Sequence, residues 1–403
     1  MSETEYSETK RRNLILVLCA ATFLIFFQAF MIAPLIPRFS EIFGTSVEYI
    51  GLIVPAYLIA YGAATLVYGP LSDHWGPQKL IFGSLAVFIV LIGITGLINT
   101  AESMIVLRLL TGLGASAVVP LSLALIGILY EYDNRGQALG WMFAAMQGGM
   151  AAGSTSGAVL EPFIGWRGLF IGSAVLSIPV FAALLPYRSL MSIDPNDSGS
   201  FSISNVLSKY AGLLSTKRGK RTYGFVFLNS IIHSGVYTWL GLYFTQRFGL
   251  GEIGIGLAIL GYGVPGFLLG PTIGSLADKY GRKWFIPIGL AIAGVSILGL
   301  VVDMHVLVAA LLVATLSLGY DTTQPLFAGI VTDLSDDMGL AMGLNVFALF
   351  TGFGLGALVF AGALQFGLES ALVAFGLVAL TGATAAAPLF RSEDESIDTP
   401  VGG

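Results

Sequence analysis

Residues 69–79, Gly-Pro-Leu-Ser-Asp-His-Trp-Gly-Pro-Gln-Lys, and residues 274–284, Gly-Ser-Leu-Ala-Asp-Lys-Tyr-Gly-Arg-Lys-Trp, are two versions of one stretch of sequence. They end a longer match without gaps, in which residues 43–79 align with residues 248–284 at a constant offset of 205. The pairs in this match are Phe43/Phe248, Gly44/Gly249, Gly51/Gly256, Leu52/Leu257, Gly69/Gly274, Leu71/Leu276, Asp73/Asp278 and Gly76/Gly281. A repeat of this kind indicates a chain built from two related halves.

The composition indicates a membrane protein. Of the 403 residues, 55% are hydrophobic and 11% are charged, whereas a soluble domain carries about 25% charged residues. A transmembrane helix needs about 20 largely apolar residues. Runs of this kind occur at residues 14–36, 47–72, 79–99, 103–129, 137–160, 167–186, 222–246, 251–276, 283–302, 305–331, 339–364 and 369–389. We therefore predict an all-α polytopic membrane protein with twelve transmembrane helices in two six-helix halves.

The longest stretch outside the predicted spans, residues 187–221, separates the two halves, 14–186 and 222–389. The tails are then residues 1–13 and the acidic residues 390–403, and we expect the acidic tail to be disordered after Arg391. Within the linker, apolar residues recur at helical spacing beside a basic cluster, which predicts an amphipathic helix on the membrane surface with its basic end near anionic headgroups. A merely solvated linker is the alternative. The residues concerned are Ile203, Val206, Leu207, Tyr210, Leu213, Leu214, Lys217, Arg218, Lys220 and Arg221.

Several classes of protein are excluded by the sequence. The single cysteine, Cys19, allows no internal disulfide and no cysteine metal site, and the three histidines, His74, His233 and His305, are scattered. The sequence contains no hydrolase or nucleotide-binding motif and no basic face for nucleic acid. We therefore expect no enzymatic activity, no metal or other cofactor and no nucleic-acid partner.

Lysine and arginine are distributed unevenly between the two ends of the predicted spans. If the amino terminus lies inside, the cytoplasmic segments hold fifteen of the 19 cations, and the outer loops hold Arg38, Arg167 and Arg247. Because positively charged loops stay in the cytoplasm, we predict that both termini are cytoplasmic. The short loops fit a multi-pass protein of a prokaryotic plasma (inner) membrane, and we expect a monomer in the lipid bilayer.

The repeated stretch resembles the loop motif of the major facilitator superfamily, and the resemblance extends over all twelve predicted spans. Glycine at positions 76 and 281 suits a sharp turn between two helices. The resemblance implies that Asp73 holds the two halves together on the cytoplasmic side, near a helix amino terminus and cations. His74 and Pro77 replace arginines that are usual in the family, so a helix-end polar residue without this role is the alternative. The motif residues are Gly69, Asp73, Gly76 and Lys79 in the first copy, and Gly274, Asp278, Gly281 and Arg282 in the second.

Two further segments resemble the twelve-span drug:proton antiporters. Residues 108–115, Arg-Leu-Leu-Thr-Gly-Leu-Gly-Ala, are similar to the arginine motif of their fourth helix. Gly140, Gly149, Gly153 and Gly157 match the spacing of their fifth-helix motif, from which Ser154 and Ala158 depart. Small residues four apart let another helix approach closely. The resemblance implies that helices 5 and 8 meet there across the two halves; ordinary small-residue packing is the alternative.

The four helices that line the central cavity of the resembled fold each carry a polar residue: Gln28, Arg108, His233 and Asp321. An ionisable residue within a span costs about 2.5–3.5 kcal/mol on insertion scales, so it usually has a function. Since burial favours the neutral form of a carboxyl, Asp321 is the predicted proton carrier, with His233 sharing or relaying the proton. A structural Asp321 and a packing His233 are the alternatives. Arg108 is expected to reach the membrane surface, or to bind Gln28 or an anionic group of the substrate.

The predicted cavity also includes Phe27, Met146, Tyr237, Tyr320 and Asn345. Such an apolar, aromatic and adaptable site suits lipophilic compounds. We predict a secondary active transporter that exports small, mostly hydrophobic compounds in exchange for protons by alternating access, with the proton gradient as its energy source. The alternatives are a facilitator for a specific metabolite or organic anion and, from another class, a lipid scramblase or membrane sensor of the same fold.

The distribution of lysine and arginine gives a test of topology. Reporter fusions at the carboxyl terminus and within residues 187–221 should both report a cytoplasmic location, because the basic segments flank both points. An extracellular signal from either fusion would contradict the predicted number of spans.

Overall fold

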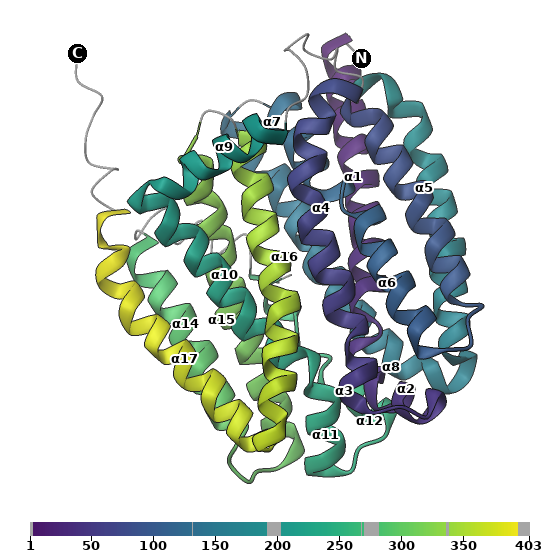
Figure 1. Ribbon diagram of the computed structural model, residues 1–403. Helices are drawn as coiled ribbons and strands as arrows, with labels where there is room; N and C mark the ends of the chain where they lie inside the picture. Colours follow the sequence, from purple (N-terminus) through teal and green to yellow (C-terminus); the bar gives the residue numbers. More distant parts are fainter. Residues whose placement is uncertain are drawn as a thin grey trace.

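The computed structural model describes residues 3–130, 132–191, 203–266, 268–269, 282–335 and 338–393, and every element in these ranges is a helix. In Figure 1, α1 begins and α17 ends at the upper end of the molecule, which we call the terminal side. The short helices α2, α3, α11 and α12 lie at the opposite end, the far side.

The first half contains eight α-helices and two 3-10 helices. They are α1 (Glu3–Phe30), η1 (Ala33–Leu35), α2 (Ile36–Phe43), α3 (Val47–Gly51), α4 (Ile53–Trp75), α5 (Pro77–Thr95), α6 (Ala101–Ala115), α7 (Val118–Leu129), α8 (Tyr132–Leu184) and η2 (Leu185–Leu190).

The described residues of the linker and the second half also form helices. Their described elements are α9 (Ile203–Ser215), α10 (Lys217–Thr238), α11 (Leu240–Phe248), α12 (Glu252–Ala258), α14 (Arg282–Gly299), α15 (Val306–Thr332), α16 (Met338–Ala363), η3 (Leu364–Phe366), α17 (Leu368–Leu389) and η4 (Arg391–Glu393).

Eight helical segments of the described chain are long and apolar enough to cross a membrane, and α10 with α11 forms a ninth across a bend of 42°. One of the eight, Gly140–Leu190, has 51 residues and turns at Gly165, so it contains two of the predicted spans. Trp284–Gly299 is a shorter apolar helix, and the predicted span 251–276 lies partly outside the described residues. The all-helical membrane fold is confirmed, and these segments are consistent with twelve spans.

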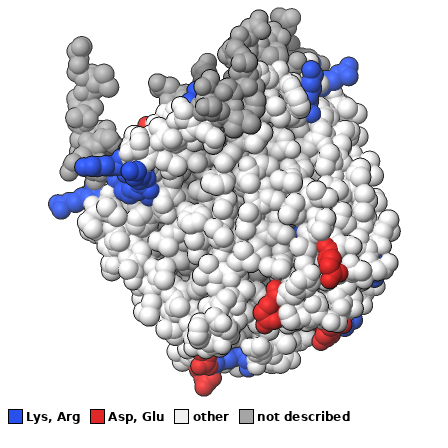
Figure 2. Space-filling view, viewed as in Figure 1, with Lys and Arg blue, Asp and Glu red and all other residues white. Residues whose placement is uncertain are grey.

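The outer surface is that of a protein in lipid. Figure 2 shows a broad uncharged belt, with lysine and arginine gathered mostly at the terminal side and acidic side chains mostly at the far side. Large apolar side chains are exposed around the molecule, such as Phe163, Leu97 and Leu307 at 74%, 69% and 71%. A surface of this kind is stable only where hydrocarbon replaces water.

The sequence repeat is also a structural repeat. Gly44 ends α2 with φ of 60°, and its partner in the repeat, Gly249, ends α11 with φ of 63°. Both glycines are in the left-handed conformation that side chains disfavour. Gly76, between α4 and α5, likewise has φ of 80°, which confirms the predicted turn at this position.

A second pair from the repeat brings the halves together at the far side. A Cβ atom on Gly51 would lie 2.7 Å from Cη2 of Trp239, in the other half. A Cβ atom on its partner Gly256 would lie 2.9 Å from Cβ of Ala158, again in the other half. Neither contact leaves room for a side chain. In each half, the duplicated glycine therefore allows a close approach to the other half.

The glycine stripe on α8 packs within its own half. Cβ atoms on Gly149, Gly153 and Gly157 would collide with the backbone of Phe23, Phe27 and Met31, respectively, on and just after α1. The expectation that this stripe meets helix 8 across the halves was therefore wrong. The reason is geometric: residues two apart on a helix point about 200° away from each other, and the contact with the second half uses the opposite face, where Gly263 touches Ala151.

The second half repeats this arrangement on α16. Gly352 and Gly356 pack against the backbone of Phe227 and Ile231 on α10, within the half. Gly354, two residues away, packs against Ile59 of α4 in the first half. Figure 1 accordingly shows α16 beside α4 where the halves meet. Helices α8 and α16 thus each join their own half by one face and the partner half by the other.

Helix α9 forms in the linker where the amphipathic helix is predicted, and its location on the membrane surface stays a prediction. In α9, Tyr210 and Leu213 are buried, and the Tyr210 hydroxyl donates to the Leu66 carbonyl oxygen at 3.2 Å. At the basic end that follows, Nη2 of Arg218 pairs with Glu393 of η4 at 2.7 Å, and Arg221 pairs with the same carboxylate. Glu393 is buried, so the chain is packed as far as this residue, and the remainder of the acidic tail, residues 394–403, lies outside the described residues.

The stripe on α8 supplies a test of packing. Gly153→Leu should destabilise the protein by roughly 1–3 kcal/mol or more, because the atoms that meet the new side chain are α1 backbone and cannot move aside. Gly140→Leu is the matched control on the same helix, since nothing lies within 4 Å of its Cβ position. Thermal unfolding in detergent should separate the two variants; equal midpoints would contradict the close contact.

Candidate functional site

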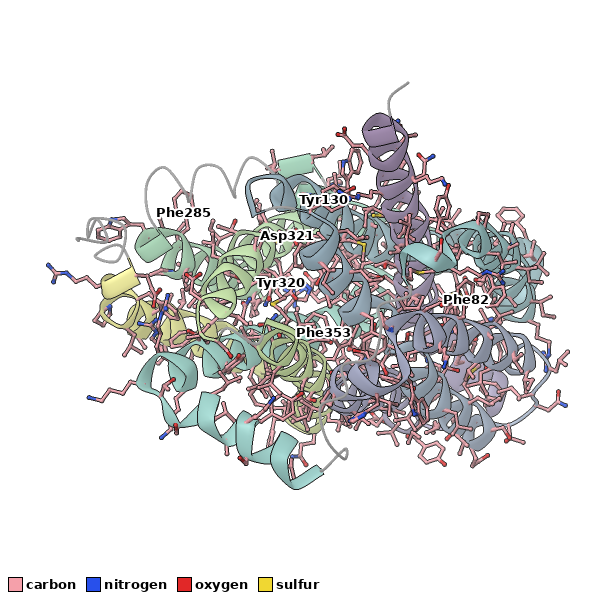
Figure 3. The ribbon with its side chains drawn as sticks, turned by 90° about the horizontal axis from the view of Figure 1, so that it is seen from above. Phe82, Tyr130, Phe285, Tyr320, Asp321 and Phe353 are labelled. Carbon is pink, nitrogen blue, oxygen red and sulfur yellow. The ribbon has the colours of Figure 1, made fainter. Side chains whose placement is uncertain are left out.

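The candidate site lies between the halves. Viewed from the terminal side in Figure 3, the labelled side chains of Asp321, Tyr320 and Phe353 lie near the middle, where the two sets of helices meet. Phe82 and Phe285 lie toward opposite sides of the molecule. The predicted residues Gln28, Arg108, His233, Asp321 and Asn345 are all buried, none more than 5% exposed.

Arg108 is enclosed within the first half. Its Nη1 donates to Oε1 of Gln28 at 3.0 Å, its Nη2 to the Ala29 carbonyl at 3.1 Å and its Nε to the Ile53 carbonyl at 3.2 Å. The guanidinium carbon also lies 4.1 Å from the centre of the Tyr57 ring. The predicted contact with Gln28 is confirmed, and extension to the membrane surface is excluded because Arg108 is 1% exposed.

The end of α1 explains why this arginine is stabilised. Helix α1 ends at Phe30, so the Ala29 carbonyl lies in its last turn. The carbonyl end of a helix carries partial negative charge and unpaired acceptors. Arg108 satisfies one of these acceptors, Ala29 O, and a cation–π contact with Tyr57 adds to its stabilisation. Among the ion pairs of the described residues, none includes Arg108.

A cluster of aromatic rings joins the halves beside this arginine. Tyr61 of α4 stacks on Phe350 of α16 with centroids 4.2 Å apart, and Phe30 of α1 meets Tyr237 of α10 at 5.5 Å. We call the whole set the central aromatic cluster. Its members are Phe26, Phe30, Tyr57, Tyr61, His233, Tyr237, Tyr262, Tyr320, Phe350 and Phe353.

Several polar atoms around this cluster have no hydrogen-bond partner. A buried polar group without a partner is costly, so such groups are available to a ligand. All of them belong to uncharged side chains. They are Nε2 of Gln28, the hydroxyls of Tyr57, Tyr61, Tyr237 and Thr351, and Oδ1 of Asn345.

His233 is held inside the cluster. Its ring stacks on Tyr320 with centroids 3.7 Å apart, and its Nδ1 lies 2.9 Å from the Tyr262 hydroxyl. The ring therefore packs between aromatic neighbours and also has a hydrogen-bond partner. Both roles expected for it, packing and proton sharing, are compatible with this position.

Asp321 contacts both halves. Its Oδ2 accepts from the Ser317 hydroxyl at 2.8 Å, and its Oδ1 accepts from Nε2 of Gln147 on α8. A Cβ atom on Gly266 would lie 2.5 Å from the Asp321 carboxyl carbon, so the segment before the second-half loop presses directly on the carboxylate. Asp321 is 3% exposed, and none of the ion pairs among the described residues includes it.

One connected path links His233 to Gln147. The Tyr262 hydroxyl contacts His233, and the next residue, Gly263, donates its N–H to the Ser317 hydroxyl at 2.8 Å. Ser317 in turn donates to Asp321, which accepts from Gln147. A change at the aromatic cluster can therefore reach the carboxylate through one backbone step and two hydrogen bonds.

The other predicted residues are placed less centrally. Phe27 is half-buried and lies at the contact of α1 with α8, where its backbone meets Gly153. Met146 is buried. In the loop motifs, Gly69 and Lys79 lie at the terminal end of α4 and the start of α5. The side chains of Asp73 and Arg282, and residues Gly274, Asp278 and Gly281, lie outside the described part of the chain.

Sequence reasoning missed Gln147, Ser317, Phe350 and Phe353. Gln147 had a usable signal, since it is an amide in the middle of an apolar span and such residues are costly in lipid. Ser317 had another, because it is four residues before Asp321 on one helix face. Nothing in the sequence distinguishes Phe350 and Phe353 from aromatic residues that face lipid.

Known proteins resemble this chain along nearly its whole length. The family model of the Major Facilitator Superfamily matches residues 18–254 and 222–402. The uncharacterized MFS-type transporter YwfA of Bacillus subtilis (strain 168) is 26% identical over 315 residues, which cover 77% of this chain and 75% of that protein. The cephamycin export protein CmcT of Amycolatopsis lactamdurans is 30% identical over 176 residues, covering 43% of this chain and 36% of CmcT.

The fold is shared with solved structures. The human organic anion transporter MFSD10 (TETRAN) superposes with a TM-score of 0.74 at 16% identity, covering 93% of this chain and 99% of that one. This likeness concerns the fold alone. Together with the family match and the lipid-facing surface, it establishes a multi-pass membrane transporter rather than an enzyme. The chain belongs to the Major Facilitator Superfamily.

Proposed function

We propose that this transporter exports small, mostly hydrophobic compounds from the cell in exchange for protons. In this proposal both termini are cytoplasmic, the far side is extracellular, and the protein lies in the plasma membrane. The observation that carries the proposal is the position of Asp321, a carboxyl buried at the boundary of the two halves and bonded to both.

Exchange requires a group that binds a proton when the site faces out and releases it when the site faces in. A carboxyl in a dry interior is suited to this task, because burial disfavours its charged form while hydrogen bonds favour it, so that small rearrangements change its protonation. Asp321 has donors from α8 and α15 that move apart if the halves move. Its protonation is therefore tied to the geometry of the boundary between the halves.

The substrate class follows from the side chains beside Asp321. The central aromatic cluster offers ring faces from both halves, and the unpartnered atoms around it belong to amides and hydroxyls. Such a site suits uncharged or weakly polar aromatic compounds. The similarity to CmcT, a cephamycin export protein, supports outward transport of an organic compound.

A facilitator for organic anions is the competing function, with Arg108 as the anion partner. The contacts of Arg108 argue against it. Each of its three nitrogens already donates to an acceptor of the protein, and the Tyr57 ring covers the guanidinium. An anion would have to displace these contacts, so we assign Arg108 to holding α1, α4 and α6 together.

Arg108→Lys tests that assignment. Lysine keeps the charge but lacks the planar fork that serves three acceptors, so the variant should lose about 1.5–3 kcal/mol of stability. Thermal unfolding measures the stability of the variant. Transport assays then compare uncharged with anionic compounds. Retained stability together with a selective loss of anion transport would instead favour the facilitator.

Asp321→Asn tests proton coupling. The amide keeps the shape and hydrogen-bonding capacity of the carboxyl but cannot titrate, so reconstituted protein should exchange substrate yet not concentrate it in response to a pH gradient. Uptake of uncharged aromatic dyes into proteoliposomes, with and without a proton uncoupler, measures this. Accumulation should fall to the level of protein-free liposomes; full accumulation would place the carrier elsewhere or exclude proton coupling.

A further inference from the structure

We propose that Gln147 is a coupling residue, whose hydrogen bond to the Asp321 carboxylate locks the empty, deprotonated transporter with its far side closed. This inference rests on the proposed proton exchange and adds to it a device that prevents proton leakage. The bond joins α8 of the first half to α15 of the second. We call it the Gln147–Asp321 lock.

The lock continues the far-side contact between the halves. On α8, Ala158 packs against Gly256 and Ala151 against Gly263, so one face of this helix meets the second half from the far side inward. Gln147 is one turn further along the same face, and its carbonyl oxygen also lies 3.1 Å from the Cβ position of Gly263. Separation of the halves at the far side must therefore break the Gln147–Asp321 bond.

The strength of the lock depends on the charge of Asp321. A hydrogen bond from an amide to a carboxylate is roughly twice as strong as one between neutral groups. Among the described residues, the titratable groups around Asp321 are uncharged or weakly basic: Tyr320 on its own helix, Tyr262 before the contacting segment, and His233 of α10 through Tyr262. The carboxylate accepts from Ser317 and Gln147, and no ion pair within the described part of the chain includes it. Protonation of Asp321 thus weakens the bond, and deprotonation strengthens it.

A bond that strengthens when Asp321 loses its proton can prevent an exchanger from leaking protons. The protonated transporter and the substrate-loaded transporter must change sides, whereas the empty deprotonated transporter must not, since its return would complete a cycle that carries protons alone. The Gln147–Asp321 lock holds the empty, deprotonated transporter with its far side closed. Substrate can release it through the path that leads from the aromatic cluster by Tyr262, Gly263 and Ser317 to Asp321.

Gln147→Met tests the lock without any substrate. Methionine has a similar length but no donor, so the empty deprotonated protein should change sides freely and the liposomes should leak protons. We expect a substrate-independent proton flux about tenfold or more above that of the unaltered protein, the factor expected for loss of one hydrogen bond to a charged group. The measurement uses proteoliposomes with an internal pH-sensitive dye, an imposed pH gradient and a clamped membrane potential.

Gln324→Met is the matched control. Gln324 is also a buried amide close to Asp321 in the sequence, but its Nε2 has no hydrogen-bond partner, so its removal should leave the flux unchanged. Gln147→Lys places a cation opposite the carboxylate and should slow substrate exchange below that of the unaltered protein. Equal proton flux in Gln147→Met and Gln324→Met would overturn the proposal.

The double variant Gln147→Met with Asp321→Asn separates the lock from nonspecific damage. Its flux should return to background, because the leak passes through Asp321. A leak that persists in the double variant would show a disrupted bundle and would also overturn the proposal. If the unaltered protein accumulates no substrate in a pH gradient, the proposed exchange fails; an Asp321-dependent leak in Gln147→Met would still support the lock.

Discussion

Among the buried ionisable groups are the guanidinium of Arg108 and the carboxyl of Asp321, and each must find its partners within the protein. Neither has an ion-pair partner among the described residues. Removing a charge from water costs several kcal/mol even after relaxation, so the surrounding helices are arranged to supply hydrogen bonds. Arg108 takes its acceptors from α1 and α4, whereas Asp321 takes donors from α15 and α8. The hydrogen bonds of Arg108 therefore stay within the first half, whereas those of Asp321 cross the boundary between the halves.

That difference assigns different roles to the two halves. Gln28 and His233 lie at the same offset of 205 that relates the repeated loops, one in α1 and the other in α10. Gln28 binds Arg108 and so belongs to a rigid set of contacts, whereas His233 stacks among rings that connect to Asp321. The repeat has preserved the helical frame while the polar chemistry diverged. In the proposed exchange, the proton carrier therefore lies in the second half, and the first half presents Gln147 to it.

Much of this was predictable from the sequence, and the limits have physical causes. Hydropathy gave the helical fold because lipid requires spans to be apolar and internally hydrogen-bonded, and the cost of buried polar groups singled out Arg108 and Asp321. The face used by each glycine was not predictable, because α8 carries small residues on two opposite sides. The pairing of Arg218 with Glu393 was missed for a similar reason, since a basic cluster at a membrane surface gives no sign of an acidic partner 175 residues away.

The paired faces of α8 and α16 explain how a rigid half and a movable boundary can coexist. Each helix packs glycine against backbone within its own half, where no side chain intervenes and little can shift. The opposite faces meet the partner half through Gly354, which packs against the Ile59 side chain, and through Ala151, whose Cβ packs against Gly263. Motion between the halves then has to occur at these opposite faces. Gln147 and Asp321 meet at one of them, which is where a change in charge can most effectively influence whether the halves separate.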